Sequence, residues 1–209
     1  MESNKDKVYK SIKYSIIVKN LKSGEILNER ELMNYYNIGR TPLREIFIEL
    51  VREGLVQKFP RSGTIVAPMD YNKLKETCEV RKPLERLAGE LAAERMNLDQ
   101  LKIFHSIVLT LEKSSRKGNQ EYLIGLDTDM HNLIYDSTGN NTLKTMLHQL
   151  HSFTLRYWFE PSTINIMTHI DPEQWMSIYE AIKNKDKVQA GQLLVEHLDK
   201  SLNILKNNL

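Results

Sequence analysis

Two ionisable side chains, Asp127 and His131, stand four residues apart in a stretch that is predicted to be helical. At that spacing both side chains project from one face of the helix. A carboxylate and an imidazole placed together can share a divalent metal or a polar ligand, and they can equally form a surface ion pair. The pair alone does not separate these alternatives.

Three further histidines could enlarge such a site. His197 falls in the last predicted helix, and a helical bundle could bring it opposite Asp127 and His131. His148 and His151 are three residues apart on another predicted helix and are also candidate ligands.

A second set of candidate residues consists of arginines in the first third of the chain. Arg40 and Arg44 lie four residues apart near the start of a predicted helix, and therefore on one helix face. Arginine pairs bidentately with guanine in the major groove of DNA, so a helix that begins this way is suited to reading base edges. The alternative is that both are solvated surface arginines.

The segment 28–68 supplies the elements that would position these arginines. Its first helix is predicted to begin at Asn28, the cap of a capping-box pattern. The second has Pro42 in its first turn, where a missing N–H costs nothing, and ends at Gly54. The turn between the two helices contains Gly39, which can take dihedrals that other residues avoid.

Two short runs that are prone to form strands follow, at 55–58 and 64–66. The turn-rich sequence between them predicts a hairpin with Arg61 at its tip, suited to a phosphate or the minor groove. An amphipathic helix at 7–21 and a short extended link at 26–27 precede these elements. Together they predict a winged helix-turn-helix, which lays one helix in the major groove of DNA.

The rest of the chain predicts an all-α antiparallel helical bundle. Helical spacing covers six stretches, at 71–96, 98–117, 121–138, 142–159, 172–184 and 186–206. Pro83 lies inside the first of these and is expected to bend it. The predicted fold is therefore mostly α, with a winged helix-turn-helix domain over 1–69 and a helical domain over 70–209.

Composition agrees with this division and excludes some classes of protein. The 209 residues carry a formal charge of +2, and residues 1–69 hold 12 Lys or Arg against 8 Asp or Glu. A basic N-terminal part suits contact with nucleic acid, although chance scatter of four charges is an alternative. The lone Cys78 argues against a disulfide framework and is expected to be a buried or half-buried small side chain. A start without an apolar signal core, and no apolar run of about 18 residues, predict a cytoplasmic protein that does not span a membrane.

The N-terminal segment resembles the DNA-binding domain of GntR-type transcriptional regulators. Their turn and recognition helix read roughly S-R-T-P-V-R-E-A-L, and this chain has GRTPLREIF at 39–47, followed by E-G-L-V at 53–56 and G-x-x-V at 63–66. The resemblance implies that DNA is contacted from the two helices, the turn and the wing tip, by Arg30, Arg40, Thr41, Arg44, Arg61 and Ser62. Gly39 replaces the usual Ser or Thr and removes a side-chain cap, and Phe47 replaces a common Ala.

Residues 71–209 resemble the FCD (FadR C-terminal) effector domain through loose motifs in the expected order. These motifs are Glu79-Val80-Arg81 with Leu84-Glu85, Asp127 with His131, Gly139-Asn140, and Ala181-Ile182 with Asp186, Ala190 and His197. Many members of that family bind a divalent metal through one Asp and three His, and the metal helps to hold a small carboxylate effector. Asp127, His131 and His197 match three of these ligands, whereas Trp175 stands where the remaining histidine is expected.

The resemblance therefore implies an incomplete metal site that binds a divalent ion, Zn or Ni, only weakly. The same resemblance implies an effector site formed by Arg81, Asp127, His131, Arg156, Trp175 and His197. In such a site Arg81 and Arg156 would bind a carboxylate directly, and Trp175 would form a flat apolar wall.

Together these features predict a ligand-responsive DNA-binding transcriptional regulator that binds a pseudo-palindromic operator as a homodimer. Repression relieved by the ligand follows from the resemblance only. One alternative is a constitutive dimeric DNA-binding regulator whose effector site is lost through Trp175. The other is a helical metalloenzyme with Asp127, His131 and His197 as ligands, which lacks a general base or nucleophile at a recognisable spacing.

Overall fold

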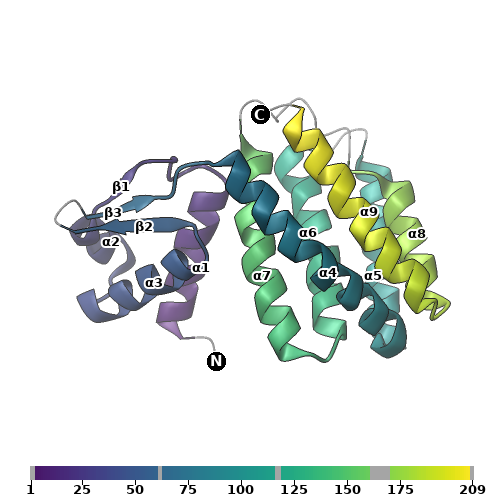
Figure 1. Cartoon of the computed structure of the whole chain (residues 1–209). Coiled ribbons are helices and arrows are strands. Elements are labelled where there is room, and N and C mark those ends of the chain that lie inside the picture. The colour runs from purple at the N-terminus through teal and green to yellow at the C-terminus, as the bar shows by residue number, and fades with distance from the viewer. Residues whose placement is uncertain (1–2, 61–62, 116–118, 161–169, 208–209) are drawn as a thin grey trace. The chain divides into compact units, whose positions relative to one another are not determined.

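The structure is a computed structural model of the chain, and it describes residues 3–60, 63–115, 119–160 and 170–207 (Figure 1). It is mostly helical with one small sheet, as predicted. The chain forms two compact units. The first consists of Met1–Tyr71 with Ser152–Glu160, and the second of Asn72–His151 with Pro161–Leu209.

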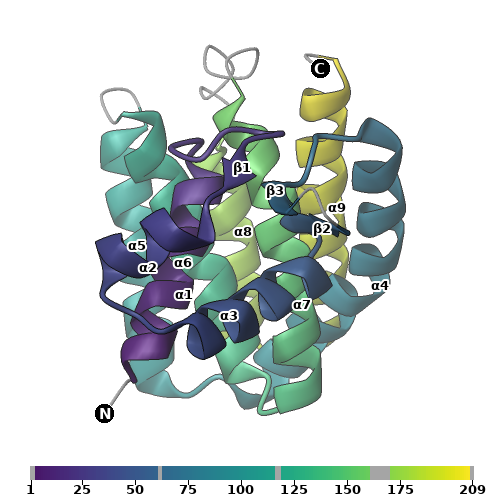
Figure 2. The same ribbon diagram turned by 90° about the vertical axis from the view of Figure 1, so that its left-hand side faces the viewer.

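The first unit contains a helix-turn-helix and a small antiparallel sheet (Figure 2). Its helices and strands, as far as they are described, are α1 (Asn4–Ile17), β1 (Ile26–Leu27), α2 (Glu29–Tyr36), α3 (Arg40–Arg52), β2 (Val56–Phe59), β3 (Gly63–Val66) and the 3-10 helix η1 (Arg156–Phe159). The strand order is β1-β3-β2, with Val56 opposite Val66. The predicted hairpin is therefore confirmed. The link predicted at 26–27 is a third strand, because pairing with β3 satisfies backbone groups that an isolated extended segment would leave open.

The core of this unit joins α1 to α3. Ile12 and Ile16 of α1 and Leu43, Ile46 and Leu50 of α3 are completely buried in one apolar cluster. Burying a side chain of this size stabilises a fold by about 1.5–3 kcal/mol. One face of α3 is thus packed against α1, which leaves its opposite face available for contact with another molecule.

The two helices of the helix-turn-helix begin differently. The side-chain oxygen of Asn28 accepts hydrogen bonds from the backbone N–H groups of Arg30 and Glu31, at 3.0 and 3.4 Å, and so caps α2 as predicted. Gly39 precedes α3 without a side-chain cap, which confirms the consequence expected of this glycine. The N–H groups of the first turn of α3 therefore lack one acceptor that a serine or threonine would have supplied.

The second unit is built from long helices whose predicted positions are confirmed to within a few residues. Those described are α4 (Tyr71–Arg95), α5 (Leu98–Ser114), α6 (Gln120–Ser137), α7 (Asn141–Leu155), α8 (Pro172–Lys183) and α9 (Lys187–Lys206). One difference concerns the fourth predicted helix, which changes to the 3-10 helix η1 at Arg156. The last residues of α7, from Ser152, are grouped with the first unit.

Helices α4 and α9 lie side by side and approach closely at two glycines (Figure 1). A Cβ atom on Gly89 of α4 would lie 2.7 Å from the carbonyl oxygen of Ala190. A Cβ atom on Gly191 of α9 would lie 2.9 Å from the carbonyl oxygen of Arg86. Side chains at these positions would push the helices apart, so the contact depends on both glycines.

Two predictions about single features can also be compared with the structure. Cys78 in α4 is a free thiol and is buried, as expected. Across the part of the chain that the structure describes, no helix combines the length and the apolar character needed to cross a membrane.

Candidate functional site

The predicted DNA-contacting residues of α2 and α3 are exposed. Arg40, Thr41 and Arg44 lie in the first two turns of α3, and Arg30 lies in the first turn of α2. Arg44 lies in a loose ion pair in which its Nε is 3.7 Å from Oε2 of Glu29. Surface pairs of this kind contribute little free energy, so the Arg44 guanidinium can exchange this partner for DNA. Arg61 and Ser62 lie outside the described residues.

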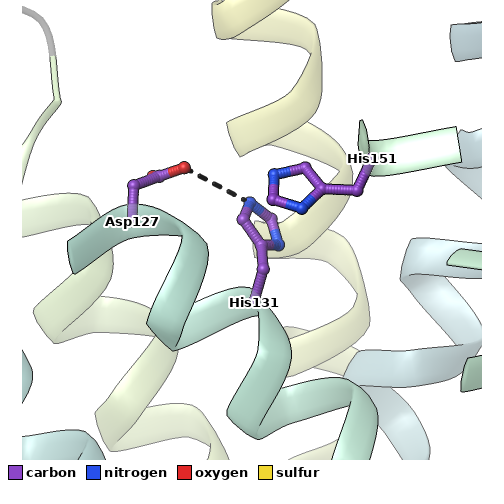
Figure 3. Close-up of side chains that lie close together, drawn as sticks. All are labelled: Asp127, His131 and His151. Carbon is purple, nitrogen blue, oxygen red and sulfur yellow. Dashed lines mark ion pairs between the residues drawn. The ribbon is translucent and has the colours of Figure 1, made fainter. Parts of the chain in front are cut away.

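A cluster of ionisable side chains lies within the second unit (Figure 3). Asp127 and His131 project from α6, and His151 projects towards them from α7. One possible ligand atom from each residue lies within 4.8 Å of the other two. Nε2 of His131 lies 3.8 Å from Oδ2 of Asp127. The i, i+4 spacing of the sequence thus forms part of a three-residue cluster, and His151 rather than His148 completes it.

Trp175 and His197 approach the other oxygen of the same carboxylate. The indole N–H of Trp175 donates a hydrogen bond to Oδ1 of Asp127 at 3.0 Å, and the Trp175 side chain is completely buried. Nε2 of His197 lies 3.5 Å from the same oxygen, while its Nδ1 lies 3.1 Å from the side-chain oxygen of Gln174. Asp127 therefore has one oxygen facing His131 and the other facing Trp175 and His197.

A buried hydrogen-bond network orients His131 through its Nδ1, the ring nitrogen that does not face Asp127. Arg81 donates from Nε to Glu85 at 2.8 Å and from Nη2 to the Tyr135 hydroxyl at 3.1 Å. Tyr135 in turn donates to Glu85 and lies 3.3 Å from Nδ1 of His131. Because the tyrosine proton is directed at Glu85, its oxygen can accept from Nδ1–H of His131. That tautomer leaves Nε2 as the lone-pair nitrogen facing Asp127.

Burial determines the protonation of the cluster. It raises the pKa of Asp127 to about 7, against the hydrogen bond from Trp175 and the charge of Arg81, which lower it. Burial lowers the pKa of His131 well below its ordinary value and that of His197 to about 3. The two histidines are therefore neutral near pH 7, which is the form that binds metals. With a pKa of about 7, Asp127 is only partly ionised at that pH, and a divalent ion beside it would favour its charged form.

The two arginines predicted to bind an effector are differently placed. Arg81 is buried in the second unit and is already paired with Glu85, 2.7 Å from Nη2. Arg156 belongs to η1 and donates to the carbonyl oxygen of Ala67 within the first unit. Arg156 follows the end of α7 at Leu155, and the segment that contains it is grouped with the first unit.

Glu85, Tyr135 and Gln174 were not among the predicted site residues. The i, i+4 spacings of Arg81 with Glu85 and of His131 with Tyr135 were the available signals. Nothing in the sequence around Gln174 indicated that it would bond to His197.

Comparison with known proteins agrees with both parts of the structure. The model of the family described as bacterial regulatory proteins, gntR family, matches residues 4–66, and the model of the FCD domain matches residues 76–200. These are the two resemblances expected from the sequence, in the same order.

The chain is a GntR-family transcriptional regulator with an FCD domain. Its relatives cover nearly the whole chain. The regulator is 27% identical to the uncharacterized HTH-type transcriptional regulator YdhC of Bacillus subtilis over 207 residues, which covers 96% of this chain and 90% of that one. It is 25% identical to the regulator McbR of Escherichia coli, covering 95% and 90%, and 27% identical to the repressor GlaR of the same organism, covering 91% and 90%.

Solved structures show the same fold. The structure of E. coli McbR/YncC has a TM-score of 0.81 and 24% identity over 99% of both chains. The relatives are named as DNA-binding regulators and not as enzymes, so the metalloenzyme is removed from the alternatives.

Proposed function

We propose that this regulator controls transcription in the cytoplasm as a homodimer bound to a pseudo-palindromic operator. The proposal is supported by the exposed arginines on one face of α3, the helix whose opposite face is buried. One such helix reads one half-site, and a two-fold dimer presents two of them to a palindromic sequence. Arg40 and Arg44 would contact base edges, and Arg30 and Thr41 would position the helix.

The effector is proposed to be a small carboxylate metabolite that binds at the Asp127 cluster. Groups of buried ionisable residues with shifted pKa values are often functional, because they are costly to bury. Arg81 is already neutralised by Glu85, so it does not offer an uncompensated positive charge to a carboxylate. A divalent ion, Zn or Ni, bound beside Asp127 would provide that charge, and its open coordination position would accept a carboxylate oxygen.

Effector binding is proposed to weaken operator binding, so that the regulator is a repressor relieved by its ligand. Some relatives are named as repressors, among them GlaR and RspR of E. coli. A ligand can only shift this equilibrium by its differential affinity for the DNA-competent and the DNA-incompetent states.

The test begins with mapping the genomic DNA bound by the regulator, because the neighbouring genes indicate the candidate metabolites. Operator affinity is then measured with and without each metabolite, in the presence of Zn²⁺ or of a chelator. A metabolite that weakens operator binding only when Zn²⁺ is present supports the proposal. Specific operator binding without any ligand response contradicts the effector part alone.

A constitutive dimeric regulator is the second candidate. It is favoured by the burial of Trp175, whose ring is completely enclosed and occupies a hydrogen-bonding position on Asp127. This candidate predicts one operator affinity under all the conditions of that experiment, and it predicts that Trp175→Ala opens a cavity without creating a response.

A further inference from the structure

We propose that the metal ion of this regulator is held by Asp127, His131 and His151, with His151 of α7 taking the role that the family resemblance gives to position 175. Trp175 then acts as a positioning residue that holds the carboxylate of Asp127. This inference rests on the proposed metal-dependent function and names its ligands.

The distances favour this set of residues. A zinc ion with ligands at about 2.0–2.2 Å in tetrahedral geometry places its ligand atoms roughly 3.4 Å apart. The three ligand atoms of Asp127, His131 and His151 lie within 4.8 Å of one another, and Nε2 of His131 is 3.8 Å from Oδ2 of Asp127. Side-chain movements of about an ångström would therefore close the triangle around an ion. The imidazole rings of His131 and His151 already lie 4.7 Å apart, centre to centre (Figure 3).

The two oxygens of Asp127 separate the metal ligands from the hydrogen-bonding residues. Oδ2 faces Nε2 of His131, which is the side of the carboxylate on which the proposed ion lies. Oδ1 accepts the indole N–H of Trp175 and faces Nε2 of His197. A carboxylate that binds a metal is commonly held in this way by a donor on its other oxygen, which fixes its orientation.

His131 is prepared for the same role by its second nitrogen. The Tyr135 hydroxyl lies 3.3 Å from Nδ1 and is itself fixed by Arg81 and Glu85, so Nε2 is directed at the proposed ion. His197 differs, because its Nδ1 contacts Gln174 and its Nε2 shares Oδ1 with Trp175. His197 is therefore assigned to the hydrogen-bonding side of the carboxylate.

In the proposed ligand set, α7 supplies a metal ligand, His151, in place of the one that the family resemblance places on α8. His151 ends the first of the two segments that form the second unit. After it, α7 continues to Leu155 and is followed by η1, and Ser152–Glu160 are grouped with the DNA-binding unit. Within that unit Arg156 donates to Ala67 and Tyr157 donates to the carbonyl oxygen of Asp70 at 2.8 Å. The proposed ligand His151 therefore lies on the helix that leads into η1, and residues of η1 contact those that follow β3.

The test uses the full chain, freed of metal by a chelator and titrated with Co²⁺, whose visible absorption reports its coordination. We expect one Co²⁺ per chain in the unmodified protein. His151→Ala should weaken Co²⁺ binding at least tenfold, and Trp175→Phe, which keeps the ring but removes the N–H donor, by about 10–100-fold. His105→Ala is the control, a histidine of α5 that lies outside the cluster and stacks on Tyr179, and it should change the affinity less than twofold.

His151→Cys provides a positive test that does not depend on a loss of binding. A thiolate at this position that binds Co²⁺ adds a sulfur-to-cobalt charge-transfer band, which the unmodified protein, with its buried Cys78, should lack. Circular dichroism of each metal-free variant verifies that it is folded.

Two results would overturn the inference. Full affinity in His151→Ala, together with lost binding in His197→Ala, would assign the ion to His197 and leave the proposed metal-dependent function intact. Absence of Co²⁺ binding by the unmodified protein would reject the site itself, whereas operator binding, measured separately, would still test the proposed function.

Discussion

The indole N–H of Trp175 donates to Oδ1 of Asp127 at 3.0 Å, at the position where the family resemblance places a metal-binding histidine. Replacing a lone-pair nitrogen by an N–H donor reverses the polarity of this contact. The hydrogen bond holds the Asp127 carboxylate in place, but it occupies Oδ1, which is then not available to an ion. The site is therefore organised before any ligand binds, with fewer donors for a metal.

We predict that the regulator contains less than one equivalent of metal as purified. Three protein ligands leave one coordination position open, whereas structural zinc sites normally use four protein ligands. His151→Ala should lower the retained zinc or nickel further, as measured by elemental analysis of both proteins. A full equivalent in the unmodified protein would show that a fourth protein donor completes the site.

Stability of the metal-free protein should fall as the pH is lowered from 6 to 5. Unfolding there allows His131 and His197 to take up a proton each, since their pKa values are lowered in the folded state. Asp127 acts in the opposite sense, because its pKa of about 7 means that it is protonated when folded and releases that proton on unfolding. These three groups together give a net uptake of one proton, which corresponds to about 1.4 kcal/mol per pH unit.

Asp127→Asn isolates the contribution of the carboxylate. It removes the opposing proton, so the slope of unfolding free energy against pH should increase by about 1.4 kcal/mol per pH unit relative to the unmodified protein. Urea unfolding at several pH values in the presence of a chelator measures both slopes. Parallel slopes would mean that Asp127 is ionised in the folded protein at these pH values.

Arg44→Ala should weaken binding to the specific operator by about 1–3 kcal/mol, the range for losing a bidentate contact with a base. Arg52→Ala is the control for charge alone, because Arg52 is exposed in the last turn of the same helix. Fluorescence anisotropy with operator and random DNA separates the two effects. An equal loss on both DNAs for Arg44→Ala would assign Arg44 to the phosphate backbone.

Gly89→Ala should destabilise the second unit by about 1–3 kcal/mol, because the added methyl group meets the backbone of α9. Gly125→Ala is the matched control in α6, where an added Cβ has nothing within 4 Å. It should stabilise the protein by about 0.5–1 kcal/mol through the better helix propensity of alanine. Thermal unfolding of the two variants compares these effects, and stabilisation by Gly89→Ala would show that the helices can separate at little cost.

Sedimentation of the full chain should give twice the mass of one chain at micromolar concentration. A two-fold dimer is needed for each copy of α3 to read one half of a palindromic operator. Single chains in solution that bind the operator only in pairs would assign dimerisation to the DNA complex.

Most of the fold could be predicted from the sequence because its signals are local. The capping pattern at Asn28, the glycine at the end of α3 and the helical spacing of the second unit depend only on residues close in sequence. Strand β1 was predicted only as a link, because two residues are too few to show an alternation of inward and outward side chains.

The candidate site was predictable only in part, for the same reason. Asp127 and His131 share one helix, so their proximity follows from their spacing. His151 was left as one of two histidines on α7, since the rotation of that helix towards α6 depends on tertiary packing. The role of Trp175 as a donor to Asp127 also depends on packing, because it joins residues 48 positions apart.

The grouping of Ser152–Glu160 with the first unit has a consequence for building hybrid sensors from this chain. A chimera cut after residue 69 would take the winged helix without Arg156 and Tyr157, which bond to Ala67 and Asp70. The transplanted head would lose these bonds and the burial that accompanies them. A portable DNA-reading module must therefore be discontinuous, with a second piece of chain grafted from the end of α7.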